Sequence, residues 1–267
     1  MSETVSNHSG ILPISQLSST LSSRTQIIFT DVDDTLTCDG ILPYETYAAL
    51  YKLQQAGYQV IPVTGASAGW CDCLIKTWPV NHIIGENGAL IMEKSENGIV
   101  STHFFKSNSV VKHDMEKLLQ LGQALTNRHP EIQYTQDQSF RLTDVAFDIG
   151  QTVTVEEPIV EQAIQWLSEQ GVQARRSSIH INVWIGEHNK ASSALHWLKQ
   201  RNLTEQDSLF IGDSPNDESM FKQFSLTVGV ANISRFIEEM ENKPAFVTEH
   251  NGGFGFVDMA NMLLQAQ

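Results

Sequence analysis

The sequence predicts a doubly wound, Rossmann-like α/β fold with a parallel sheet, into which a smaller α+β unit is inserted. Short, continuously apolar runs alternate with helical stretches from residue 26 onward, and the same alternation returns after residue 187. Such runs are typical of parallel strands that are buried on both faces. Between these two parts, apolar residues recur at every second position. That period is typical of an antiparallel sheet with one packed face and one open face.

The first α/β part, residues 26–105, is expected to hold three strands and two helices. We place the strands at "QIIFTD", "QVIPVTG" and "HIIGENG". A helix over "YETYAALYKLQQAG" follows the first strand, with Pro43 at its start and Gly57 at its end. Proline and glycine are preferred at these two helix termini. A second helix is expected over residues 67–78.

The inserted unit, residues 106–186, is expected to contain an open-faced antiparallel sheet and helices near 109–124 and 157–170. Its clearest strand is "SIHINVWI". One face of this strand carries Ile179, Ile181, Val183 and Ile185, and the other carries His180, Asn182 and Trp184. The second face is either a solvated sheet surface or a lid over a substrate.

The last part, residues 187–267, returns to the α/β alternation. Helices are expected over "NKASSALHWLKQ" and "PNDESMFKQF" and near 254–266, and strands over "SLFIGD", "LTVGVAN" and "AFVT". Residues 1–25 hold eleven Ser or Thr and two charged residues, Glu3 and Arg24. They lack the basic stretch and long apolar region of a signal peptide, so we expect a polar tail in which "ILPISQL" could dock.

The composition narrows the class of partner. The chain has 31 acidic residues against 17 Lys and Arg, a formal charge of −14, which disfavours nucleic acid and anionic membranes. No apolar run approaches the length of about 20 residues that spans a membrane. Cys38, Cys71 and Cys73 have no second Cys or His pair at zinc spacing, so we expect free thiols. We therefore expect a cytoplasmic protein, either a monomer or a small homo-oligomer.

Polar residues gather where the predicted strands end. In open α/β sheets, ligands bind at the carboxyl ends of the strands. Four segments place residues at that edge: Asp31 and Asp33, then Thr64 and Gly65, then Lys190, and finally Asp213, Asn216 and Asp217. Together they supply carboxylates, a hydroxyl, an amide and one ammonium group.

This mixture of groups suits phosphoryl transfer to a carboxylate. Carboxylates at strand ends are typical ligands of Mg²⁺, which also binds phosphate oxygens. Lys190 lies at the start of a predicted helix, where a cation gains nothing from the helix dipole, so an anionic partner is favoured. Lys190 and Thr64 can hold phosphate oxygens, one aspartate can attack phosphorus and another can transfer protons.

The four segments together resemble the haloacid dehalogenase superfamily of phosphohydrolases. "DVDDT" matches its first motif, "VTG" its second, Lys190 its third and "GDSPND" its fourth, in the right order. The long interval between Thr64 and Lys190 is similar to members with an inserted C2-type cap, such as the Cof-type (subclass IIB) sugar-phosphate phosphatases. "GENGALIM" resembles the stretch before the cap in that subgroup. The resemblance implies a core of residues 26–105 and 187–267 with a cap at 106–186.

The resemblance also implies a role for each motif residue. Asp31 would be the nucleophile that forms an aspartyl-phosphate, and Asp33 would protonate the leaving alcohol and then activate water. Mg²⁺ would be bound by the Asp31 carboxylate, the Asp33 backbone carbonyl and the Asp213 carboxylate, with Asp217 adjoining. The phosphoryl group would be held by Thr64, Gly65, Lys190 and Asn216.

Two motif positions depart from the family pattern. Asp34 stands where the subgroup usually has glycine, and Ala66 stands where an arginine often follows the second motif. Elsewhere, Glu86 and Asn87 are expected to form a turn with Gly88. Arg141, Arg175 and Arg176 are expected at the surface, unless one reaches a substrate carboxylate or second phosphate.

The expected function is a Mg²⁺-dependent phosphatase acting on a small phosphorylated metabolite, a sugar phosphate or related polyol. His180, Asn182 and Trp184 are the candidate substrate contacts from the cap. One alternative is a phosphotransferase or phosphomutase that passes the phosphoryl group to another hydroxyl. Another is a metabolite-binding module without catalysis, which the presence of Asp33 disfavours because a binder needs no acid–base group.

Overall fold

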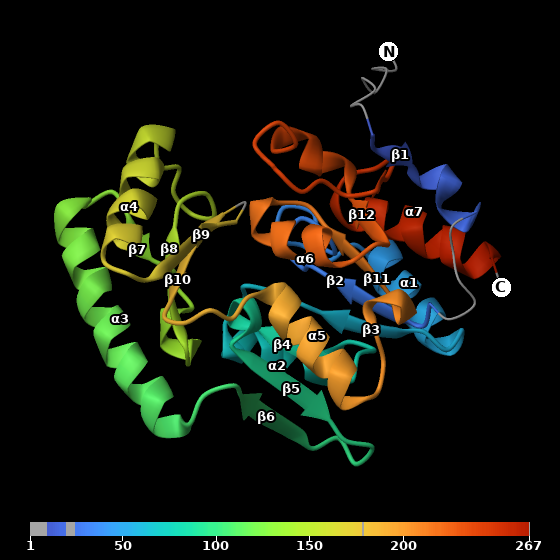
Figure 1. The fold of residues 1–267 in the computed structure, drawn as a ribbon, viewed down its shortest axis with the longest axis horizontal. Helices are drawn as coiled ribbons and strands as arrows, with labels where there is room; N and C mark the ends of the chain where they lie inside the picture. The colour runs from blue at the N-terminus through green and yellow to red at the C-terminus, as the bar shows by residue number, and fades with distance from the viewer. Residues whose placement is uncertain (1–9, 20–24, 178, 267) are drawn as a thin grey trace.

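A computed structural model describes residues 10–19, 25–177 and 179–266 (Figure 1). Its largest sheet is parallel throughout and has the strand order β1-β13-β12-β11-β2-β3. In that order the strands are β1 (Leu12–Pro13), β13 (Phe246–Val247), β12 (Thr227–Gly229), β11 (Ser208–Gly212), β2 (Ile27–Thr30) and β3 (Gln59–Pro62). This sheet and its helices confirm the predicted doubly wound α/β class.

Helices cover both faces of the parallel sheet, which is why its strands are apolar on both sides. The helices are α1 (Tyr44–Gln55), α2 (Ala68–Thr77), α5 (Lys190–Gln200), α6 (Glu218–Gln223) and α7 (Gly252–Gln265). Ile28 of β2 packs in one core cluster with residues of α1, α2 and α7. Its neighbour Phe29 points the other way and packs with residues of α5 and α6. Successive strand residues therefore contribute to two separate cores.

A second, antiparallel sheet extends the core beyond β3. It consists of β4 (His82–Gly85), β5 (Leu90–Lys94) and β6 (Val100–Phe104), in that order. A parallel bridge between Val63 and Ile84 links it to the end of β3, and the Thr64 N–H donates to the Ile84 carbonyl over 2.9 Å. The sequence predicted β4 but neither β5 nor β6.

The inserted unit is an antiparallel sheet with two helices, as predicted. The sheet order is β7 (Gln133–Tyr134), β8 (Asp144–Asp148), β10 (His180–Trp184) and β9 (Gln173–Arg176). The helices are α3 (Asn108–Arg128) and α4 (Glu157–Glu169). Figure 1 shows both helices on the outer side of this sheet, which faces the core. Ile181 and Val183 of β10 are buried against residues of these helices in a third core cluster.

The prediction of an open face on this sheet is wrong. Asn182 is 1% exposed and Trp184 is 3% exposed, although both lie on the polar face of β10. The reason is that the face is turned toward the core. A Cβ built on Gly65, after strand β3, would lie 3.2 Å from Asn182 Nδ2. The alternation in the sequence indicated which residues share a face, but it could not show what covers that face.

Part of the predicted polar tail belongs to the core. β1 pairs with β13, and the Leu12 N–H donates to the Ala245 carbonyl over 2.9 Å. A 3₁₀ helix, η1 (Ile14–Ser19), follows and buries Ile14 and Leu17 in the cluster that contains α7. Thus "ILPISQL" docks at the edge of the parallel sheet. The rest of the predicted tail, residues 1–9 and 20–24, lies outside the described residues. The domain boundaries stay predictions.

Short 3₁₀ segments complete the described chain: η2 (Glu86–Gly88), η3 (Gln138–Phe140), η4 (Glu205–Asp207), η5 (Pro215–Asp217) and η6 (Ala231–Arg235). All three cysteines are free, as predicted. Within the described residues, no helix is long and apolar enough to cross a membrane.

Candidate active site

The carboxyl ends of β2 and β11 bring the first and fourth sequence motifs together. Thr30 and Ile211 are partners in the parallel ladder, and the Asp31 N–H donates to the Ile211 carbonyl over 2.9 Å. Asp31 follows β2 directly and is buried, and Asp213 follows β11 and is also buried. The strand pairing therefore places these two carboxylates side by side.

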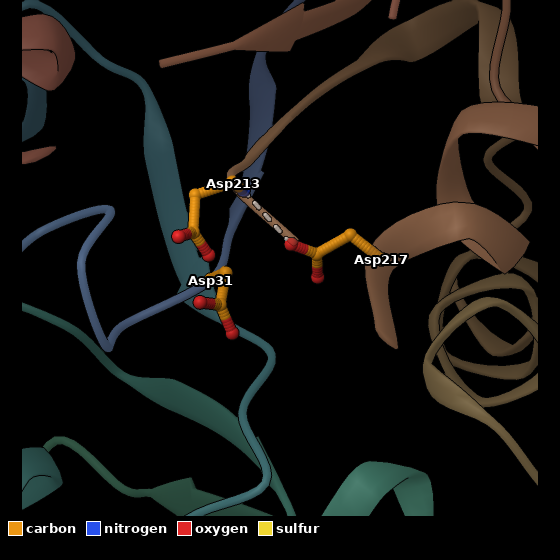
Figure 2. Close-up of side chains that lie close together, drawn as sticks. All are labelled: Asp31, Asp213 and Asp217. Atoms are coloured by element: carbon orange, nitrogen blue, oxygen red, sulfur yellow. Dashed lines mark hydrogen bonds between the residues drawn. The ribbon is translucent and has the colours of Figure 1, made fainter. Parts of the chain in front are cut away.

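Asp31, Asp213 and Asp217 form a buried acidic cluster, in which one carboxylate oxygen of each lies within 4.8 Å of the others (Figure 2). Asp217 lies at the end of η5, and its Oδ2 accepts the backbone N–H of Asp213 over 2.9 Å. A Cβ on Gly212 would clash with that same Oδ2. Glycine at 212 therefore allows Asp217 to approach the strand end.

Lys190 supplies a cation to this cluster. It is the first residue of α5, and its Nζ lies 2.5 Å from Asp31 Oδ1 and 2.7 Å from Asp217 Oδ1. The Asn189 side chain caps the helix by accepting the Ser192 N–H over 2.9 Å, which fixes where α5 begins. Burial alone would lower the pKa of Lys190, but Asp217 and Asp31 outweigh it and raise the pKa. The side chain is therefore an ammonium group.

One lysine does not balance three buried carboxylates. Burial raises the pKa of Asp31 to about 8, in spite of Lys190 beside it. Burial, together with Asp31 and Asp217, raises the pKa of Asp213 well above its usual value. Asp213 Oδ1 is buried and has no hydrogen-bond partner, whereas Oδ2 accepts a bond from Asn232 over 2.9 Å.

The donor set of the acidic cluster fits a divalent cation. Its ligand atoms are all carboxylate oxygens, which hard cations such as Mg²⁺ prefer. A cation there would use the free oxygen of Asp213 and relieve the repulsion that raises the pKa values. The predicted metal ligands are Asp31, Asp33 and Asp213. The observed cluster contains Asp31 and Asp213, and its third side chain is that of Asp217 instead of Asp33. The role of the Asp33 backbone carbonyl stays a prediction.

The acidic cluster opens into a small cavity between the core and the inserted unit. Its lining residues are Asp31, Asp33, Gly65, Ser177, His180, Asn182, Ser214 and Asn216. The cavity has a volume of about 10 Å³, roughly the room that one water molecule needs. Asp33 and Asn216, predicted from the first and fourth motifs, thus share one cavity with Asp31.

Two of the three predicted cap residues reach this cavity. His180 Nε2 lies 2.9 Å from Gln151 Oε1, and burial, with Arg141 nearby, lowers the pKa of His180 to about 4. Its imidazole is therefore neutral at physiological pH. Asn182 Oδ1 is buried without a hydrogen-bond partner. Trp184 lies elsewhere, since it lines a separate cleft and its indole N–H donates to the His188 carbonyl over 3.0 Å.

The second motif forms a tight loop at the end of β3. Thr64 is buried, and its Oγ1 accepts the Ala66 N–H over 3.0 Å. The Gly65 carbonyl accepts a bond from Arg141 Nη1 over 3.0 Å. The loop is therefore held both by its own hydroxyl and by the inserted unit.

The prediction that Arg141 lies at the surface is wrong. Its side chain is fully buried, and Nη1 also bonds both carboxylate oxygens of Asp144, at 2.9 and 3.1 Å. Nη2 lies 3.4 Å from Asp137 Oδ2. The acids at 137 and 144 were a visible sequence signal for a paired arginine. The hydrogen bond from Arg141 to Gly65 had no such signal in the sequence, because it joins residues 76 positions apart.

Glu86 does more than form a turn. Its buried carboxylate accepts the backbone N–H of Ala68 over 2.9 Å and those of Leu142 and Thr143 over 2.9 and 2.7 Å. The Thr143 hydroxyl donates to it as well. Glu86 therefore joins the core to the inserted unit, a role that its sequence context did not predict.

The fold and the site define a capped α/β enzyme with buried carboxylates and a lysine at its strand ends. The chain belongs to the haloacid dehalogenase-like hydrolases, because the model of that family matches residues 28–144 and 104–254. This match confirms the resemblance that the four motifs indicated.

Relatives and solved structures agree with this family. The chain is 25% identical to the phosphoglycolate phosphatase of Methanobrevibacter smithii over 85% of its length and 94% of the relative. It is 26% identical to that of Methanopyrus kandleri over 90% and 98%. A Thermoplasma acidophilum structure matches with a TM-score of 0.71 and 19% identity, covering 91% of this chain and 99% of that one. The sucrose-phosphatase of Synechocystis, solved with sucrose and phosphate, matches with a TM-score of 0.63 and 16% identity over 89% and 98%.

Proposed function

We propose that this hydrolase is a Mg²⁺-dependent phosphatase that cleaves a small phosphorylated metabolite through an aspartyl-phosphate. The observation that carries the proposal is the buried Asp31 carboxylate, which contacts Lys190 and faces a cavity shared with Asp33. The names of the relatives, phosphoglycolate phosphatase, support a phosphate monoester as substrate. The predicted substrate class, a sugar phosphate or related polyol, is part of the proposal.

In the first step, a carboxylate oxygen of Asp31 attacks phosphorus, and the bond between phosphorus and the leaving oxygen breaks. Asp33 gives its proton to that oxygen, so the product leaves as a neutral alcohol. Both side chains line the same cavity, which supports their pairing as nucleophile and acid.

In the second step, a water oxygen attacks the phosphorus of the aspartyl-phosphate. Asp33, now a carboxylate, accepts a proton from this water, and the bond between phosphorus and the Asp31 oxygen breaks. Inorganic phosphate leaves, and both aspartates return to their starting states. General acid–base assistance of this kind typically accelerates a reaction about 10²- to 10⁴-fold.

The residues around Asp31 hold the phosphoryl oxygens. Lys190, Thr64, Gly65 and Asn216 are assigned to this role. Asp31, Asp213 and the Asp33 backbone carbonyl would hold Mg²⁺, with Asp217 adjoining. When bound, Mg²⁺ neutralises charge on the phosphoryl oxygens and acts as a Lewis acid. Lys190 adds a fixed positive charge where negative charge develops.

Replacement of the nucleophile tests this function. Asp31→Asn should abolish phosphate release from a panel of phosphate esters with Mg²⁺, because the amide cannot form the acyl phosphate. Asp72→Asn is the matched control, since Asp72 is half exposed and pairs with Lys76 on helix α2. Circular dichroism of both variants should match that of the parent protein.

The same assay tests the intermediate and the metal. Rapid quenching with a ³²P-labelled ester should give a phosphoenzyme that peptide mapping assigns to Asp31, and EDTA should stop turnover. Label on another residue contradicts the assignment of Asp31. Full activity in EDTA contradicts the role of Mg²⁺.

A further inference from the structure

Two larger clefts adjoin the small cavity at Asp31. One of about 610 Å³ shares Asn216 with that cavity. The other, of about 1050 Å³, shares Asp33 and His180 with it. We call the second one the aromatic cleft because its wall includes Trp70, Trp78 and Phe140.

We propose that the aromatic cleft holds the leaving group of the substrate and selects uncharged leaving groups with an apolar ring face over those that carry a carboxylate. This inference rests on the proposed phosphatase function. It identifies the class of alcohol that the enzyme accepts, which the shared family motifs do not specify.

The position of Asp33 decides between the two clefts. In phosphoryl transfer the attacking and leaving oxygens lie roughly in line on opposite sides of phosphorus. With Asp31 as the attacking group, the leaving oxygen must lie where Asp33 can protonate it. Asp33 lines the aromatic cleft and is absent from the wall of the 610 Å³ cleft. The alcohol is therefore expected in the aromatic cleft.

The walls of the aromatic cleft are suited to a ring. Trp70 of α2 is 55% exposed, and Phe140 of η3 in the inserted unit is 61% exposed. Phe140 packs against helix α2 next to the position of Trp70, since a Cβ on Gly69 would be 2.6 Å from the Cβ of Phe140. Exposed aromatic side chains beside a polar site provide apolar surface for a ligand ring. Leu42 and Val32 extend this surface.

The charges along the aromatic cleft disfavour an anionic leaving group. Besides Asp33, which carries a proton in the proposed first step, its acidic lining residues are Asp34, Asp39 and Asp137. Among the lining residues that the structure describes, only Arg141 carries a permanent positive charge. Its guanidinium is already bound to Asp144, Asp137 and the Gly65 carbonyl. Arg235, which lies 3.8 Å from Asp34 Oδ2, is shared in the same way with Asp213. Each of these two cations thus already contacts two acids, and a carboxylate in the cleft would meet an excess of negative charge.

A pair of substrates that differ in one group tests the charge preference. 2-Phosphoglycolate carries a carboxylate where 2-hydroxyethyl phosphate carries a hydroxymethyl group. With Mg²⁺ we expect kcat/KM to be about tenfold or more higher for the hydroxyethyl ester, because several acids repel the carboxylate. Asp39→Asn should narrow this difference, since it removes one of these charges without adding bulk.

Benzyl phosphate tests the aromatic wall. Trp70→Ala and Phe140→Ala should each lower the ratio of kcat/KM for benzyl phosphate to that for 2-hydroxyethyl phosphate about three- to tenfold. Phe254→Ala is the control, because Phe254 is 45% exposed on α7 and does not line the aromatic cleft. It should leave the ratio unchanged.

The outcomes separate this inference from the proposed function. Release of phosphate with 2-phosphoglycolate as the better substrate overturns the charge selection and leaves the phosphatase function intact. If Trp70→Ala and Phe140→Ala both leave the ratio of kcat/KM for benzyl phosphate to that for 2-hydroxyethyl phosphate unchanged, the aromatic cleft does not bind a ring. No release from any of the three esters with Mg²⁺ overturns the phosphatase function, and this inference with it.

Discussion

In the acidic cluster, Asp213 has a carboxylate oxygen that receives no hydrogen bond from the described residues. Its Oδ1 is buried without a partner, and burial with two neighbouring carboxylates raises its pKa. Asp213→Asn should raise the Mg²⁺ concentration for half-maximal activity about tenfold or more, because even the loss of a residue that only supports a metal ligand typically weakens metal binding about 10- to 100-fold. It should also raise the melting temperature of the metal-free protein, since one of three repelling charges is gone.

Both effects are measured by following enzyme activity and melting temperature as the Mg²⁺ concentration is increased. Asp72→Asn, which removes an exposed acid, should change neither. An unchanged Mg²⁺ requirement together with a lower melting temperature in Asp213→Asn would mean that Asp213 has a structural role instead of binding the metal.

Residues at the strand ends could be predicted from sequence, and those at the cap–core interface could not. Asp31, Lys190 and Asp213 each stand next to a regular strand or helix, so local pattern and order were enough to place them on one edge. Arg141 and Glu86 depend on contacts between segments 76 and 57 positions apart. No local pattern carries that information, and for this reason Arg141 was wrongly predicted at the surface.

At the scale of elements, the Arg141–Asp144 pair joins strand β8 to the Thr64–Gly65 loop after β3. Both side chains are fully buried, and burial raises the pKa of Asp144 to about 7 in spite of Arg141. Arg141→Met leaves that carboxyl without its partner. The free energy of unfolding should therefore fall by about 3–5 kcal/mol, measured by urea denaturation.

A second variant distinguishes the effect of losing the charge pair from the effect of losing side-chain packing. Arg141→Met combined with Asp144→Leu should recover most of the stability, because neither charge remains buried. Arg176→Met is the matched control, since Arg176 pairs with Glu157 in a partly exposed position and should change stability by less than about 1 kcal/mol. A double variant as unstable as the single one would show that the charge pair is not the cause.

Elements with a clear apolar or amphipathic pattern were predicted, whereas strands β1, β5 and β6 were missed. Helix α1 begins and ends within two residues of its expected limits, because Pro43 and Gly57 mark them. Strand β1 has only two residues, and its partner β13 begins at Phe246. A strand of two residues is too short to show a periodic pattern of apolar residues, so only its pairing with β13 in the structure reveals it.

At the scale of the whole molecule, the described conformation is closed. The cavity at Asp31 has room for about one water molecule, far less than a phosphate ester needs. Glu86 holds the inserted unit against the core through the amides of Leu142 and Thr143. We therefore expect these contacts to break when a substrate binds, so that the inserted unit moves away from the strand ends.

Hydrogen exchange should detect this opening without substrate. If the inserted unit moves as a rigid body, the amides of Leu142 and Thr143 lose their bonds to Glu86 while the β8–β10 ladder stays paired. They should exchange faster than the amides of β8 and β10, because local opening needs less free energy than global unfolding. Glu86→Gln should accelerate the two amides by about tenfold or more, since bonds to a charged acceptor are the stronger ones, and leave the β8–β10 amides unchanged. Equal exchange rates for both groups of amides, in the parent and in the variant, would mean that the inserted unit separates from the core only when the whole protein unfolds.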